Sequence, residues 1–206
     1  MEPGGAARRR RHLVEVLRRL IVILTAIFAA VLTSVCVASV AQAKPTEEPM
    51  KLVSTAFSEG QAIPKRFTCE GDDLSPALSW SDVPGAARSL AIIVDDPDAP
   101  DPAAPKMTWV HWVLYDIPAS SVSLAEAVAV SALPAPTREG TNDWQRKGYG
   151  GPCPPIGRHR YFFKLYALDT QLGERGALTK SQLEAAMEGH VIAQAQLMGT
   201  YQKAGK

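Results

Sequence analysis

The chain has 206 residues, of which 46% are hydrophobic and 21% are charged, a composition typical of one globular domain with an appendage. Residues 1–43 hold six of the 22 basic residues and two of the 21 acidic ones, which leaves 16 basic and 19 acidic residues, a net charge of −3, in residues 44–206. Because this faintly acidic part has no basic stripe, the composition excludes nucleic acid and an anionic membrane surface as partners.

The N-terminal segment has the parts of a secretory signal. Arginines at positions 8–11 and 18–19 precede an uncharged apolar run over residues 20–40, which ends at the small-x-small site Ala41-Gln42-Ala43. We therefore expect residues 1–43 to be a signal peptide, cleaved near Ala43 to release a periplasmic or secreted protein. The apolar run is long enough to span a bilayer, so a membrane anchor formed by residues 20–40 is the alternative. Residues 44–49 are then a linker, and residues 50–206 form the domain.

Four segments predict strands, because runs of β-branched and aromatic residues are bounded there by Pro, Gly and Asp. They are residues 78–80, 89–94, 108–115 and 160–167. Residues 119–137 contain few aromatic residues and predict a long irregular connection or an edge strand. Residues 140–148 predict a polar loop.

Near the C-terminus the hydrophobic period changes from two to about 3.6. Thr179 and Gln182 have the spacing of a capping box. The apolar residues after them lie on one helical face: Leu183, Met187, Val191, Ala195 and Met198. This pattern predicts a helix over roughly residues 180–199, with His190 as a packing or capping residue and not a ligand-binding one.

Two histidines lie in aromatic, β-branched runs, each next to a turn-forming sequence. Strict alternation places His111 on one face with Trp109, Val113 and Tyr115, and places His159 with Tyr161, Phe163 and Leu165. An imidazole in apolar surroundings needs a hydrogen-bond partner, and Asp96 and Asp98 at the end of the strand over residues 89–94 are the candidates. Such pairing would fix the tautomer and direct a ring N–H into a cavity.

The turn before His159 has the composition of a binding loop. Gly150 and Gly151 allow backbone N–H groups to approach a ligand, and Pro152, Pro154 and Pro155 make a stiff wall. Together the two histidine segments predict one anion-binding pocket. Alone, either histidine is better explained as a satisfied core residue.

These residues carry a family resemblance. Asp-Pro-Asp-Ala-Pro over residues 96–100, with Gly-Pro-Cys-Pro-Pro-Ile-Gly-Arg-His-Arg-Tyr over residues 151–161, resembles the phosphatidylethanolamine-binding protein family. The sequence of residues 67–80 is similar to the bacterial Raf-kinase-inhibitor-like branch of that family. The resemblance spans about residues 50–201 and rests on several separated motifs in the expected order.

The resemblance implies a mainly β domain, a Greek-key antiparallel sandwich or barrel with peripheral helices, one of them C-terminal. It also implies a small pocket for phosphate or a phospholipid headgroup, without a cofactor. By motif position the pocket residues are Asp96, Asp98, His111, Pro154, His159 and Tyr161, to which the sequence adds Trp109 and Gly151 as ligand-binding residues. Thr108 stands where many eukaryotic members have an acidic residue, a departure that concerns recognition of the amine and not of the phosphate.

Other interpretations compete with these assignments. The aspartates following the strand over residues 89–94 are typical turn caps, and for Asp95 that is the whole role we expect. Trp80, Trp109 and Trp112 are expected in the core and not as ligand platforms, and a position at the mouth of the cavity is the alternative for Trp109, which shares a face with His111. The hydroxyl of Tyr161 would need a partner if it were buried, which favours a pocket position.

Four functions from different classes follow. The first is a binding module for a small phosphoryl anion or headgroup, with no catalysis. The second is a hydrolase, although no nucleophile elbow is present. The third is a metal site formed by Asp96, His111, Cys153 and His159, whose spacings match no compact ligand pattern. The fourth, inhibition of a protein partner, comes from the resemblance alone, and fold does not transfer it. The oligomeric state is left open, with a homodimer as one alternative.

Removal of the signal would leave two cysteines, Cys69 and Cys153. An oxidising compartment favours their pairing, and the family resemblance places both in loops around the pocket. The alternative is that each is a small buried hydrophobic residue, with Cys153 held too rigidly between two prolines to reach its partner.

Overall fold

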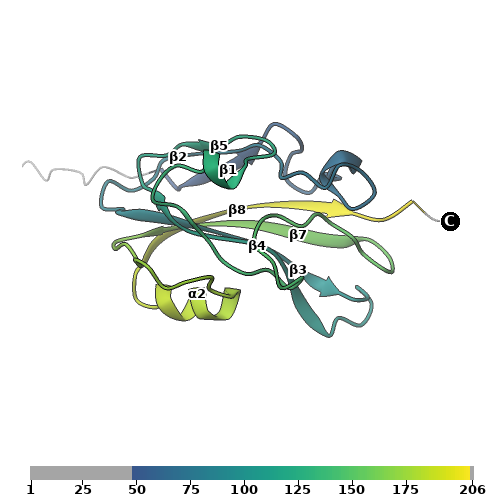
Figure 1. Ribbon diagram of the computed structural model, residues 1–206. Coiled ribbons are helices and arrows are strands. Elements are labelled where there is room, and N and C mark those ends of the chain that lie inside the picture. The colour runs from purple at the N-terminus through teal and green to yellow at the C-terminus, as the bar shows by residue number, and fades with distance from the viewer. Residues whose placement is uncertain (1–47, 205–206) are drawn as a thin grey trace, which may run out of the picture. The chain divides into compact units, whose positions relative to one another are not determined.

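The computed structural model describes residues 48–204, which form two antiparallel sheets and one helix. The larger sheet has the strand order β6-β4-β3-β7-β8 and the smaller one β1-β2-β5. In Figure 1 the smaller sheet lies over one face of the larger sheet and helix α2 lies under the other. The elements are β1 (Lys51–Ser54), η1 (Lys65–Phe67), β2 (Leu78–Ser81), β3 (Ser89–Ala99), β4 (Met107–Pro118), β5 (Ser123–Leu124), η2 (Val130–Ala132), β6 (Arg138–Glu139), β7 (His159–Leu168), α2 (Lys180–Met187) and β8 (Val191–Tyr201).

Two hydrophobic layers follow from this arrangement. Between the sheets, Leu52 and Trp80 of the smaller sheet pack in one cluster with Ile92 of β3. On the other face, Ile93 packs in a second cluster with Leu183 of α2. Since both faces of β3 are covered, its residues are buried almost without interruption. The side chains at the end of β3 therefore point into the protein and not into water.

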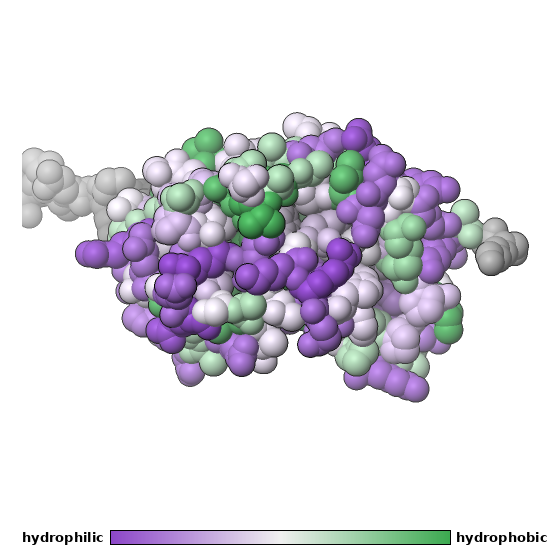
Figure 2. All heavy atoms as spheres, viewed as in Figure 1, coloured by the Kyte–Doolittle hydropathy of each residue, from purple (hydrophilic) through white to green (hydrophobic). Residues whose placement is uncertain are grey.

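The expected fold class is confirmed, as a sandwich of two open sheets. All four expected strands are present, and each is longer than its apolar run predicts. Residues 119–137 contain the short strand β5 and the 3-10 turn η2 within an otherwise irregular connection. In Figure 2 a small hydrophobic cluster lies over β5 and η2 on a mostly hydrophilic face.

The expected helix over residues 180–199 is wrong in its second half. The capping box of Thr179 and Gln182 is present, and Leu183 and Met187 are buried, but α2 ends at Met187. Gly189 then adopts φ +77°, which reverses the chain. The residues that follow form the 11-residue strand β8, ten of whose residues pair with β7, because β-branched residues favour a strand and the partner strand lies alongside.

His190 lies in the turn between α2 and β8. Its Nδ1 is 2.9 Å from Oδ1 of Asp169, and 47% of its side chain is exposed. It is therefore neither packed in the core nor inside a helix.

The expected signal or anchor lies outside the described residues. Within residues 48–204 no helix is long and apolar enough to cross a membrane.

Candidate functional site

A cavity of about 300 Å³ lies where β3, β4 and β7 meet two loops, at the place the histidine pattern predicts. Five of the eight expected ligand-binding residues line it: Asp96, Trp109, His111, Pro154 and His159. Gly151, Asp98 and Tyr161 do not belong to the lining. The other lining residues are Ala99, Pro100, Met107, Trp144, Cys153 and Pro155.

His111 enters the cavity through an irregularity in β4. Val94 of β3 lies opposite Trp112, whereas Asp95 lies opposite Val110, so His111 is the extra residue of a β-bulge. The expectation that His111 shares a face with Val113 and Tyr115 is therefore wrong, because the bulge breaks the alternation. Those two residues pack in the cluster that contains α2.

Two aromatic rings contact the imidazole ring of His111 beside the cavity. Its ring contacts the rings of Tyr161 and Trp144 edge-on, at centroid distances of 5.2 Å and 5.1 Å. Trp144 also meets Trp109 edge-on at 5.4 Å. The ring of His111 is thereby fixed on two sides by other rings.

The hydrogen bonds of His111 define its tautomer. Its Nδ1 lies 2.6 Å from the carbonyl oxygen of Gly150, and since a carbonyl only accepts, Nδ1 carries the proton and donates it. Burial lowers the pKa of His111 to about 4, so the ring is neutral near pH 7. Its Nε2 then carries a lone pair and is a buried acceptor, which has no hydrogen-bond partner among the described residues.

Asp96 and His159 form the buried pair that the sequence predicts. Nδ1 of His159 lies 2.7 Å from Oδ2 of Asp96, and Nε2 lies 2.9 Å from the carbonyl oxygen of Ile156. A carbonyl accepts only, so Nε2 carries a proton, and a second proton lies between Nδ1 and the carboxylate. Burial is the largest influence on Asp96 and raises its pKa, which favours sharing that proton. The pair is neutral overall, and both ring nitrogens are already bound within the protein.

Asp98 supports the pair from behind. Its backbone N–H donates to Oδ1 of Asp96 at 2.8 Å. Its carboxylate accepts a two-point contact from the guanidinium of Arg160, at 2.9 Å and 2.7 Å, together with the backbone N–H of Arg160. Hydrogen bonding to Arg160 is the main cause that lowers the pKa of Asp98. Asp98 is thus a positioning carboxylate whose charge is already compensated.

Tyr161 lies between the two histidines, behind the residues that line the cavity. It is 1% exposed, and its ring stacks against His159 at a centroid distance of 6.4 Å. Burial raises the pKa of its hydroxyl far above the ordinary value, so the group stays protonated. The hydroxyl is buried and has no hydrogen-bond partner among the described residues, which makes it a second unpaired polar group beside the cavity.

The two glycines do not present free N–H groups to the cavity, contrary to the expectation. Gly150 N–H donates to the carbonyl of His111 at 3.0 Å, and Gly151 N–H donates to Oδ1 of Asp73 at 2.6 Å. A Cβ on Gly150 would lie 2.4 Å from the Trp144 ring, and one on Gly151 would lie 2.4 Å from the carbonyl oxygen of Phe67. Close packing of the loop, and not ligand access, explains these glycines.

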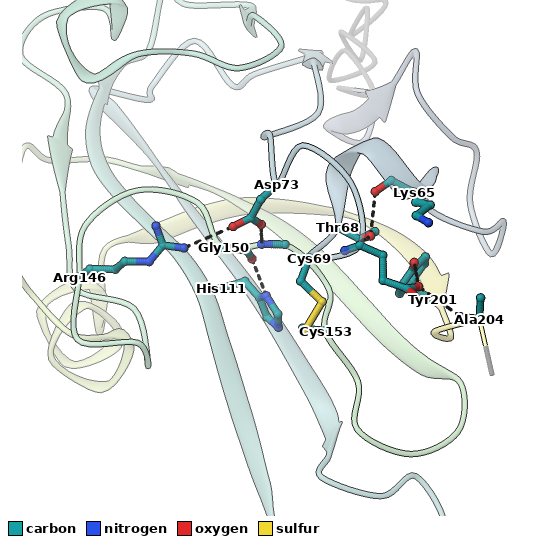
Figure 3. Close-up of a disulfide and its surroundings, with 12 residues drawn as sticks. Lys65, Thr68, Cys69, Asp73, His111, Arg146, Gly150, Cys153, Tyr201 and Ala204 are labelled. Atoms are coloured by element: carbon teal, nitrogen blue, oxygen red, sulfur yellow. Dashed lines mark hydrogen bonds and ion pairs between the residues drawn. A yellow bond between two sulfur atoms is a disulfide. The ribbon is translucent and has the colours of Figure 1, made fainter. Parts of the chain in front are cut away.

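A disulfide joins Cys69 to Cys153 beside this loop, with their Cα atoms 5.4 Å apart. Figure 3 shows the bond next to the loop whose Gly150 carbonyl holds His111. Cys153 lines the cavity, so the disulfide fixes one wall of it to the segment that follows η1. Because Cys153 has no free thiolate, it cannot be a metal ligand of the kind considered from the sequence.

Asp95 is not a turn cap, contrary to the expectation. It is fully buried on the α2 side of β3, and its Oδ2 accepts from Lys164 of β7 at 2.8 Å and from Lys180 of α2 at 2.6 Å. The adjacent Asp96 points to the cavity. Because successive side chains of a strand point to opposite faces, Asp95 belongs to a structural ion cluster and Asp96 belongs to the site.

Sequence reasoning missed Trp144 and Met107 as lining residues. Trp144 lies in the polar loop over residues 140–148, where a lone tryptophan was the available signal. That loop is held by Asn142, whose side chain donates to the carbonyl of Gly148 and accepts from the backbone N–H of Trp144. For Met107 no signal was present.

Comparisons with known proteins identify the family of this chain. The model of the phosphatidylethanolamine-binding protein family matches residues 53–202. A UPF0098 protein from Chlamydia pneumoniae is 47% identical over 154 residues, covering 75% of this chain and 99% of that protein. A UPF0098 protein from Methanothermobacter thermautotrophicus is 48% identical over 155 residues, with coverage of 75% and 99%.

Two solved structures are similar to this chain. A phosphatidylethanolamine-binding protein homologue from Chlamydia trachomatis has a TM-score of 0.70 at 45% identity, covering 76% of this chain and 99% of that one. YbcL from E. coli, a member of the mammalian phosphatidylethanolamine-binding protein family, has a TM-score of 0.69 at 29% identity, with coverage of 76% and 100%.

Proposed function

The chain belongs to the phosphatidylethanolamine-binding protein family, and on that premise we propose that it is a binding protein whose cavity holds the phosphoryl group of a small compound or phospholipid headgroup. The observation that carries the proposal is the convergence of His111 and His159 on one cavity, where the buried Nε2 of His111 lacks a partner among the described residues. A buried polar atom left unpaired costs stability, so its retention favours a role in binding.

The size and the walls of the cavity suit such a ligand. About 300 Å³ is at the lower end of small-molecule sites, which matches a headgroup and not a whole lipid. The walls from Met107, Trp109, Trp144 and the three prolines are apolar and would contact the organic part of an ester. The polar end would then meet the histidines on the floor.

We propose binding without catalysis. Among the described lining residues there is no serine or threonine hydroxyl. The one cysteine in that lining, Cys153, is in a disulfide. The described lining therefore offers no hydroxyl, thiolate or amine nucleophile to the bound group. The lining provides imidazole and carboxylate, which orient a ligand.

Export is part of the proposal. The basic, apolar and small-residue pattern of residues 1–43 supports it, and so does the Cys69–Cys153 disulfide, because such bonds persist in oxidising compartments. N-terminal sequencing of the native protein tests this point: a chain beginning at Lys44 supports it, and a dominant membrane-bound form that begins at Met1 contradicts it.

Calorimetric titration with methyl phosphate at pH 6 tests the binding function. His159→Ala and Trp144→Ala should each weaken binding at least tenfold, since loss of the ordered floor or of a wall removes roughly 1.5 kcal/mol or more. The surface variant His190→Ala is the matched histidine control and should bind like the wild type. Thermal unfolding of each variant separates lost binding from lost folding. Absence of saturable binding by the wild-type protein would refute the proposal.

A further inference from the structure

The unpaired nitrogen in the cavity is an acceptor. Nδ1 of His111 donates to the carbonyl of Gly150, so a neutral ring has its lone pair on Nε2. The ring is 2% exposed and is held by the edge-on contacts with Trp144 and Tyr161. It cannot rotate to offer a donor without breaking the Gly150 bond. A ligand group that reaches Nε2 must therefore bring a hydrogen.

The charges around the cavity agree with this polarity. No Lys or Arg belongs to the described lining, which has one carboxylate, that of Asp96. Asp96 is compensated by His159, and the nearby Asp95 is compensated by Lys164 and Lys180 on the far side of the sheet. Asp98, behind the pair, is compensated by Arg160. Tyr161 is protonated, so the titratable groups that face His111 leave no net positive charge in the cavity.

A phosphate monoester dianion suits such a cavity poorly. It offers only acceptor oxygens, one of which would face the lone pair of His111, and its two charges would lose water without a cation in return. The acid monoanion of the same ester has one charge fewer and one P–OH donor. A phosphodiester has the single charge but no proton to donate.

Resting on the proposed function, we infer that the cavity selects phosphate monoesters in their monoanionic form, with the P–OH donating to Nε2 of His111, and rejects phosphodiesters and sulfate esters. The ligand brings the proton, because the free ring is neutral. Monoester lipids such as phosphatidic acid and soluble monoesters share this chemistry. An intact phosphodiester headgroup lacks it.

The inference predicts a pH dependence that belongs to the ligand. With a second pKa of about 6 for a phosphate monoester, the monoanion falls from about one half at pH 6 to about one hundredth at pH 8, so affinity should fall on the order of 50-fold. The midpoint should move upward for methylphosphonate, whose second pKa is higher. A transition that belonged to a protein group would keep one midpoint for both ligands.

Calorimetry with three matched ligands is the test. At pH 6, methyl phosphate should bind at least tenfold more tightly than dimethyl phosphate or methyl sulfate, which have one charge and no acidic proton. Short-chain phosphatidic acid is the lipid arm: tighter binding than methyl phosphate assigns a lipid ligand, and equal binding assigns a soluble one. Either result keeps the inference, which rests on the shared P–OH.

The variant His111→Asn isolates the acceptor. The Asn amide can still donate to the Gly150 carbonyl, but no atom replaces Nε2, so the variant should lose the preference for the monoester over the diester. If it does not fold, the wild-type ligand series decides alone. Equal binding of monoester and diester by the wild type, or affinity that is constant between pH 6 and pH 8, overturns the inference while the proposed function stands. No binding of any of these ligands at pH 6 refutes both.

Discussion

Reduction of the Cys69–Cys153 disulfide should lower the free energy of unfolding by about 4.5 kcal/mol. The bond joins residues 84 positions apart. In the chain-entropy treatment, a closed loop of about 85 residues restrains the unfolded chain by roughly 15 cal/mol/K, which is about 4.5 kcal/mol at 25 °C. This is a large fraction of the 5–15 kcal/mol that is usual for a domain.

Urea unfolding, followed by tryptophan fluorescence, measures this effect. With a denaturant dependence of about 2 kcal/mol/M, reduction should move the midpoint down by about 2 M. The double variant Cys69→Ser, Cys153→Ser should unfold like the reduced protein and should not respond to reductant. Since Cys153 lines the cavity, the reduced protein should also bind methyl phosphate more weakly at pH 6.

Two outcomes would contradict this reasoning. A midpoint shift worth less than about 1 kcal/mol would mean that the unfolded chain is already compact or that strain in the bond cancels the entropic gain. Two free thiols from Cys69 and Cys153 in the untreated protein, detected by intact mass after alkylation, would mean that the bond does not form.

Three further predictions concern single residues. Asp95→Asn should destabilise the domain by about 2 kcal/mol in thermal unfolding, because two lysines lose a buried carboxylate; an effect below 0.5 kcal/mol would contradict the assigned ion cluster. Gly151→Ala should destabilise by about 2 kcal/mol, since its Cβ would clash with backbone, whereas the control Gly85→Ala, with open space, should change little; equal effects would refute the packing argument. Because the pKa of Asp98 is lowered in the folded state, its contribution to the free energy of unfolding is complete above the unfolded pKa of about 4 and is lost as pH falls through the lower folded pKa. Asp98→Asn should therefore flatten the acid limb of a curve of stability against pH. An unchanged acid limb would contradict this sign.

Local sequence was sufficient where local physics decides the structure. The apolar run before Asp95 predicted a buried strand, and β3 is covered on both faces. The Thr179 capping box predicted the start of α2, because its hydrogen bonds lie within four residues. The end of the helix was not predictable by periodicity, since Val191, Ala195 and Met198 continue the helical face of Leu183 but also occur in a strand. Pairing with β7, a long-range contact, decided between the two.

The site was predictable in its composition but not in its polarity. The sequence motifs predicted that Asp96, His111 and His159 lie close together. All three line the cavity, because each lies in a strand of the larger sheet. The tautomer of His111 depends on the carbonyl of Gly150, which is 39 residues away. The roles of Asp95 and Asp96 depend on which face of β3 each occupies, and that is fixed by the register with β4 and β7.

The bulge at His111 connects these observations. In a regular strand, burying Trp112 between the sheets would direct His111 to the opposite face, toward α2. The extra residue in β4 lets Trp112 remain in the core between the sheets while His111 reaches Tyr161 and the cavity. The same displacement brings its Nδ1 to the Gly150 carbonyl, which leaves Nε2 as the acceptor. The ligand preference inferred above thus follows from one inserted residue, because the bulge fixes both the position and the protonation of the ring.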